Sequence, residues 1–135
     1  MKNNLKQKQC RRVKLTKADV LGEGTFAMSE TAANDNDFIE IEIREAAKVL
    51  SNIVSEEGEI DLFHVNCEGC EWEMFENVIE HELHKKMKII QFGTHFFQQI
   101  TRISSRYCKI REELAKTHKM IWGQAFAWER WDKLN

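Results

Sequence analysis

The chain has 135 residues, of which 42% are hydrophobic and 31% are charged. This balance is typical of one globular domain with a single core, and it excludes an intrinsically disordered chain. The formal net charge is -2, with both signs mixed along the sequence, so charge gives no reason to expect a nucleic-acid partner. Basic residues concentrate in the first fourteen positions, where we expect a solvated N-terminus.

The sequence shows no targeting or membrane signal. No apolar run approaches the roughly 20 residues of a membrane span, and no hydrophobic stretch typical of a signal peptide occurs at the N-terminus. A cytoplasmic location is the default expectation, and a longer parent in the secretory pathway is the alternative. The four cysteines are Cys10, Cys67, Cys70 and Cys108. Because the apolar content suffices for a core, we expect these thiols to be mostly reduced.

Strands and helices are predicted to alternate from Phe38 onward, after a poorly defined segment at residues 1–37. In that segment, short strands are expected at 13–15 and 20–21, followed by a turn at Gly22-Glu23-Gly24. Beyond it, alternating and helical apolar spacings predict a strand at 38–43, a helix at 44–55, a strand at 60–65, a helix at 71–85, a strand at 87–92, a helix at 102–118 and a β segment at 120–128 broken at Gly123.

This order predicts an α/β fold over residues 38–135. Crossover helices favour parallel neighbours, so we expect a mostly parallel sheet with a parallel core of two or three strands and a mixed edge. Ligands in such sheets bind outside the carboxyl ends of the strands. The strand ends at 64–69 and 91–95 are therefore the first places to look for a site.

The most informative segment runs from Asp61 to Glu71, with the sequence DLFHVNCEGCE. A strand leads here through an acidic turn into a helix, which can present polar groups and free helix N–H groups to a ligand. From local physics alone, the simpler roles are turn and capping chemistry for Asn66 and Glu68, and complementing the helix dipole for Glu71.

The stretch IDLFHVNCEGCEWEMFENVIE resembles the motif of FkbM-like methyltransferases, in which a strand is followed by x-E-G-x-E and a helix. The likeness continues through KIIQFGTHFF and RYCKIREELAKTHKMIWGQAFAWERW, and it covers about residues 38–132. The form NCEGCEWE is similar to animal members of the methyltransferase-like protein 24 type. The resemblance implies the C-terminal half of a Rossmann-like fold, S-adenosylmethionine as cofactor, and methyl transfer to a hydroxyl of a small-molecule or glycan-like acceptor.

The resemblance also implies roles for particular residues. Glu68, Gly69 and Glu71 match the family motif, Asn66 stands where most members have Asp, and His64 stands where many have Lys. Asn66, Glu68 and Gly69 would then contact the cofactor. Asn66, Glu68 and His95 would form the catalytic centre, with His95 as a general base because an imidazole titrates near neutral pH. A structural imidazole at His95 is an equal alternative.

The glycine-rich turn that would hold the cofactor in such a fold has no clear counterpart. Gly22-Glu23-Gly24 is the only candidate, and residues 25–37 lack the pattern of a helix after it, so a plain turn is favoured. We expect that both cofactor-binding strands lie outside this sequence. The chain would then be a truncated or degenerate form that is inactive alone.

Two alternatives concern the Cys67-Glu68-Gly69-Cys70 segment. A C-x-x-C between a strand and a helix is the position of a thiol redox pair. Against this interpretation, the chain has no proline for an adjacent cis-proline, and Glu68 would raise the thiol pKa values. A zinc site would draw its ligands from His64, Cys67 and Cys70, with His81 and His84 nearby in sequence. A second close ligand pair is missing, so no metal is expected.

The last alternative is a non-catalytic interaction module. Aromatic residues gather near the C-terminus, namely Trp122, Phe126, Trp128 and Trp131. Their simplest role is to cover the sheet and its core. An exposed aromatic patch would instead favour self-association.

Overall fold

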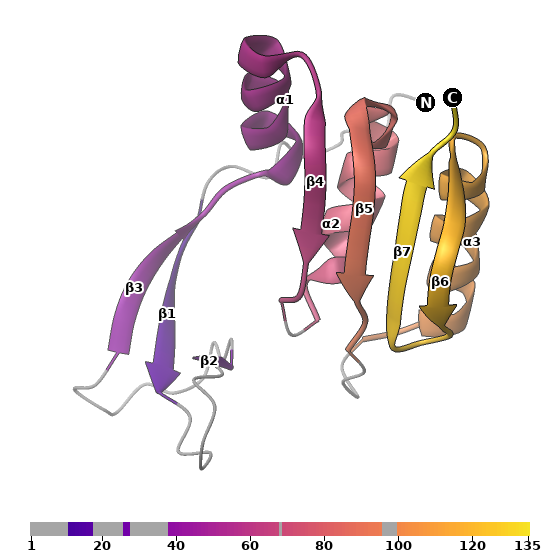
Figure 1. Cartoon of the computed structure of the whole chain (residues 1–135). Coiled ribbons are helices and arrows are strands. Elements are labelled where there is room, and N and C mark those ends of the chain that lie inside the picture. The colour runs from indigo at the N-terminus through magenta and orange to yellow at the C-terminus, as the bar shows by residue number, and fades with distance from the viewer. Residues whose placement is uncertain (1–10, 18–25, 28–37, 68, 96–99) are drawn as a thin grey trace, which may run out of the picture. The chain divides into compact units, whose positions relative to one another are not determined.

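The computed structural model describes residues 11–17, 26–27, 38–67, 69–95 and 100–135 (Figure 1). The chain divides into two compact units, Met1–Glu45 and Ala46–Asn135. Each unit is described by itself below. The strand predicted at 20–21 and the turn predicted at Gly22-Glu23-Gly24 lie outside the described residues.

The first unit contains a small antiparallel sheet with the strand order β2-β1-β3. Its strands are β1 (Arg11–Lys17), β2 (Phe26–Ala27) and β3 (Phe38–Ile43). β1 and β3 pair from Arg11↔Ile43 to Thr16↔Phe38. The alternating pattern at 38–43 therefore forms a strand, as predicted, and its partner in this sheet is β1.

The second unit is an α/β structure built on a four-stranded sheet with the order β4-β5-β7-β6. α2 connects β4 to β5, and α3 connects β5 to β6. α2 and α3 contact each other and lie against the same face of this sheet (Figure 1). The elements are α1 (Ala46–Glu57), β4 (Ile60–Val65), α2 (Glu71–Glu80), the 3-10 helix η1 (Leu83–Lys86), β5 (Met87–Gly93), α3 (Ile103–Ala115), β6 (His118–Gln124) and β7 (Trp128–Lys133).

The sheet is mixed, and the prediction of a mostly parallel sheet is wrong. β4 and β5 form the parallel core, from Ile60↔Met87 to Val65↔Phe92. β7 is antiparallel to both β5 and β6. The single β segment predicted at 120–128 in fact covers most of β6, a turn and the first residue of β7, which together form a hairpin. Its turn at Ala125–Ala127 is too short for a crossover, so β6 and β7 must run in opposite directions. The α/β class and the mixed edge are confirmed.

The core of the second unit lies between the sheet and its helices. It is formed by apolar side chains at helical spacing on α2 and α3 and by apolar residues of β5, which are almost fully buried: Trp72, Phe75, Val78, Met87, Ile90, Phe92, Tyr107, Ile110 and Leu114. Phe75 packs on Phe92 with ring centroids 4.6 Å apart. Where the structure describes the chain, none of its helices is both long enough and apolar enough to cross a bilayer.

Two buried histidines make this unit sensitive to acid. His84 and His118 are 3% and 2% exposed. Burial lowers the pKa of both imidazoles below the ordinary 6.5, and the nearby His118 lowers the pKa of His84 further. The unfolded chain therefore takes up protons first as the pH falls, and stability that is present above pH 6.5 is lost below it. Urea denaturation at several pH values should show the free energy of unfolding falling from pH 7 toward pH 5.

The contribution of His84 can be isolated with His84→Leu. Its Nδ1 atom is buried and has no hydrogen-bond partner among the described residues, and its ring makes a hydrogen bond to the backbone of Val78. Leucine gives up that hydrogen bond at every pH, but it removes the group that takes up a proton as the pH falls. We expect this variant to lose less stability between pH 7 and pH 5 than the parent does. His81→Gln is the matched control because His81 is exposed. Equal pH dependence in the parent and in His84→Leu would contradict the explanation.

Candidate functional site

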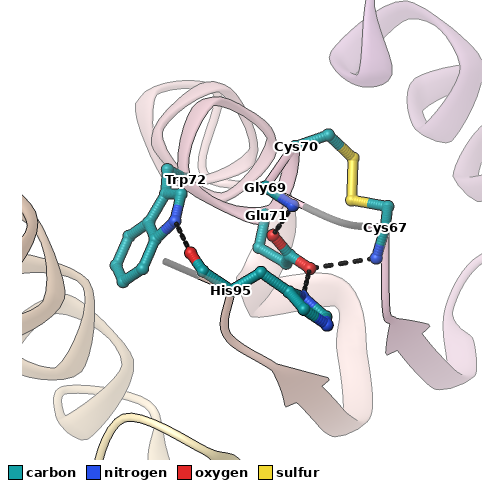
Figure 2. The surroundings of a disulfide bond; sticks show 6 residues. All are labelled: Cys67, Gly69, Cys70, Glu71, Trp72 and His95. Atoms are coloured by element: carbon teal, nitrogen blue, oxygen red, sulfur yellow. Dashed lines mark hydrogen bonds and ion pairs between the residues drawn. A yellow bond between two sulfur atoms is a disulfide. The ribbon is translucent and has the colours of Figure 1, made fainter. Parts of the chain in front are cut away.

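The bend between β4 and α2 is closed by a covalent bond. Cys67 and Cys70 form a disulfide with Cα atoms 5.4 Å apart (Figure 2). Between them, Gly69 has a φ of 102°, a left-handed conformation that glycine adopts without steric cost. The prediction of reduced thiols is therefore wrong for this pair, because composition does not reveal that a tight bend brings the two sulfur atoms together. Cys108 is free and exposed, and Cys10 lies outside the described residues.

The carboxylate of Glu71 fills the inside of this bend. Its side chain is 1% exposed. The backbone N–H of Cys67 donates to Oε1 at 2.9 Å, and the backbone N–H of Gly69 donates to Oε2 at 2.8 Å. A buried carboxylate needs such partners because burial removes its hydration. Glu71 therefore fixes the bend from within, as Figure 2 shows.

His95 joins the bend from the next strand. It follows the end of β5, and its Nδ1 lies 2.6 Å from Oε1 of Glu71. The indole N–H of Trp72 donates to the backbone oxygen of His95 at 3.0 Å. The His95 side chain is 28% exposed. One contact holds the imidazole and the other holds its backbone, so a partly accessible histidine is fixed beside a buried carboxylate (Figure 2).

This meeting of two strand ends follows from the topology. β4 and β5 are parallel neighbours, so their carboxyl ends lie at the same edge of the sheet. Glu71 comes just after β4, and His95 comes just after β5. Their contact joins residues 24 positions apart in sequence.

The remaining residues of the predicted site lie differently. Asn66 is exposed at the end of β4. The N–H of Gly69 is engaged by Glu71, so Gly69 contributes the shape of the bend. Glu68 lies outside the described residues. His64 is exposed, and its ring stacks on Trp128 with centroids 5.6 Å apart.

Glu71 is the residue whose role sequence reasoning missed. An acidic residue in the first turn of a helix already has a routine role in complementing the helix dipole. The available signal was its position directly after a C-x-x-C bend, where backbone N–H groups converge on the helix start.

The geometry also bears on the other interpretations. Within the described ranges, no group of three or more His, Cys, Asp or Glu residues is placed to hold a metal ion. The sulfur atoms of Cys67 and Cys70 are bonded to each other, as they are in the oxidised form of a thiol redox pair. Of the aromatic cluster, Trp131 is buried, whereas Trp122 is 46% exposed and Phe126 is 37% exposed.

In comparisons with known proteins, no family model, curated protein or solved structure matches this chain. The likeness to FkbM-like methyltransferases therefore depends on the residues of the motif itself.

Proposed function

We propose that this chain is the C-terminal part of a methyltransferase domain that uses S-adenosylmethionine and methylates a hydroxyl oxygen. The observation that carries the proposal is the Glu71–His95 pair, with Nδ1 and Oε1 2.6 Å apart at the carboxyl ends of two parallel strands. Ligands of α/β sheets bind outside this edge. The motif that resembles the FkbM-like family, NCEGCE, forms the bend at the same edge.

The sheet is compatible with a Rossmann-like parent. Because β7 is antiparallel to both β5 and β6, β6 runs in the same direction as β4 and β5. Three strands thus share one direction and one runs against them. Doubly wound sheets commonly carry a reversed strand near one edge. The helices α2 and α3 connect strands of equal direction, as crossover helices do.

His95 is suited to remove a proton from a hydroxyl acceptor. A carboxylate at Nδ1 favours the tautomer that carries its proton there, and Nε2 on the other side of the ring is then the basic nitrogen. Glu71 acts as the positioning residue for this base. When bound, S-adenosylmethionine supplies a methyl group on a sulfonium, which reacts with an oxygen nucleophile.

Of the residues that the motif assigns to the cofactor, Asn66 fits best. Its side chain is exposed at the end of β4, and an amide both donates and accepts hydrogen bonds. Glu71 already occupies the N–H of Gly69. Because the glycine-rich segment has no counterpart in this sequence, we expect weak cofactor binding and no turnover by this chain alone.

Titration of S-adenosylmethionine, followed by amide NMR, tests the proposal. We expect the resonances of Asn66, Gly69 and His95 to shift together, with a dissociation constant of about 1 mM, which corresponds to about -4 kcal/mol. Asn66→Ala should weaken this binding severalfold. Asn52→Ala is the matched control, because Asn52 is exposed on α1. Absence of shifts at these residues at several times that concentration would remove the enzyme interpretation for this chain.

A further inference from the structure

The Cys67–Cys70 disulfide is built into the same bend that holds the Glu71–His95 pair. We propose that this disulfide is a reversible switch: it exchanges with low-molecular-weight thiols, and its reduction loosens the hold of Glu71 on His95. The exchange reaction stands by itself. Its meaning as regulation of a methyltransferase rests on the proposed function.

The contacts of Glu71 make the coupling direct. Two of its hydrogen-bond donors belong to the bend: the N–H of Cys67 comes from one of the bonded cysteines, and the N–H of Gly69 lies between them. The position of the carboxylate therefore depends on the closure of the bend. The same Oε1 that accepts from Cys67 contacts Nδ1 of His95, so a change in the bend reaches the imidazole through one side chain.

The disulfide is poorly explained as a structural cross-link. Disulfides stabilise a fold more when they close longer loops, and these cysteines are only three positions apart. The helix that follows is already anchored by Trp72, Phe75 and Val78, which are 0–1% exposed. A cross-link that adds little to the fold, placed beside a partly exposed histidine, is better suited to a chemical role.

The surroundings of the disulfide also permit exchange. Both cysteines are only half-buried, so an incoming thiolate can approach them. Cys70 is the N-cap residue of α2, where the helix dipole stabilises a thiolate. The charges of Glu68 and Glu71 oppose this effect. The Glu71 carboxylate is hydrogen-bonded by the N–H groups of Cys67 and Gly69 and contacts His95, and these contacts reduce its influence on the thiols. Glu73 is exposed, so solvent screens its charge.

The reaction has two steps. A thiolate attacks one sulfur of the pair, the Cys67–Cys70 bond breaks, and a mixed disulfide forms while the other cysteine leaves as a thiolate. A second thiolate then attacks the outer sulfur of the mixed disulfide. The two external thiols are oxidised to a disulfide, and Cys67 and Cys70 are reduced and take up two protons in total.

The first measurement tests the exchange on the full chain carrying Cys10→Ser and Cys108→Ser, in which every thiol counted comes from the pair. The protein is equilibrated in glutathione buffers of varied redox ratio, alkylated and weighed by mass spectrometry. We expect both redox forms to be populated across the series and to interconvert on reoxidation. A pair that stays bonded in excess reduced glutathione while the protein is folded, or that never bonds in oxidised glutathione, overturns the proposal.

The second measurement tests the coupling. The rate at which diethyl pyrocarbonate modifies His95 is compared in the oxidised and reduced forms. We expect reduction to raise this rate by about two- to tenfold, the range that corresponds to the loss of one hydrogen bond. His81, exposed at the other end of α2, should react equally in both forms.

A Cys67→Ser, Cys70→Ser double variant keeps this test independent of the reductant. Its His95 should react as in the reduced protein and should not respond to glutathione. Equal reactivity of His95 in the oxidised parent, the reduced parent and the double variant overturns the coupling. No methyl donor or acceptor takes part, so such a failure is distinct from a failure of S-adenosylmethionine binding.

Discussion

Replacement of Glu129 by alanine is expected to lower the free energy of unfolding by about 3–5 kcal/mol, because it removes the shared acceptor of a buried polar cluster. Glu129 lies on β7 and is 1% exposed. The hydroxyl of Tyr107 donates to its Oε1, and the indole N–H of Trp131 donates to its Oε2 at 2.7 Å. Nε of Arg111 lies 3.6 Å from Oε1. Urea denaturation measures the change.

Two comparisons separate this effect from the loss of any acidic side chain. Glu112→Ala removes an exposed carboxylate from α3 and should change stability by no more than about 0.5 kcal/mol. Burial, and then the hydrogen bond to Glu129, raise the pKa of Tyr107, so the phenol keeps its proton and remains a donor. Tyr107→Phe should therefore cost about 1–3 kcal/mol. A loss in Glu129→Ala as small as that in Glu112→Ala would show that the cluster does not stabilise the fold.

The local patterns of the sequence predict most elements of the second unit. Apolar spacing places strands at 60–65 and 87–92, where β4 and β5 lie, and a helix at 102–118 around α3. The helix predicted at 71–85 is divided, however. α2 ends at Glu80, and Glu82 takes a φ of 56° before η1 begins. Residues 71–85 contain no glycine or proline to mark that break, so the apolar periodicity alone predicts one continuous helix.

The C-terminal hairpin shows a stronger limit of sequence reasoning. Phe126 occupies the turn with a φ of 59°, a conformation that is uncommon for a bulky residue. Its ring stacks on Tyr107 with centroids 4.2 Å apart, and its N–H donates to the Tyr107 hydroxyl at 3.3 Å. These contacts come from α3, far away in sequence. They stabilise a turn in residues that carry no turn signal, and this turn makes β7 run antiparallel to β6.

The sequence indicates where the candidate site lies, but it does not indicate which side chains contact one another there. Reasoning from strand ends pointed to the bend after β4 and to the segment around His95, and the parallel pairing of β4 with β5 brings them together. Which groups touch depends on a contact across 24 positions of sequence, between Glu71 and His95. No local pattern encodes this contact. The sequence assigns Glu71 to the helix dipole and to the family motif, but it does not predict the contact with His95.

Replacement of Glu71 by glutamine is expected to lower the free energy of unfolding by about 1–3 kcal/mol, because it leaves a buried donor unsatisfied. The amide oxygen of glutamine can accept from Cys67 and contact His95. Its NH₂ group would then face the N–H of Gly69, which bonds Oε2 in the parent. Glu71→Ala removes every acceptor and should cost about 3–5 kcal/mol. Urea denaturation of the oxidised proteins measures both changes.

Glu73→Gln is the matched control for this prediction. Glu73 lies in the same first turn of α2 but is exposed. Both carboxylates interact with the helix dipole, and Glu71 in addition accepts from the N–H groups of Cys67 and Gly69. The dipole interaction is worth about 0.3–1 kcal/mol at an exposed site. If the two glutamine variants lost equal stability, the carboxylate of Glu71 would act through the dipole alone, and the bend would not depend on it.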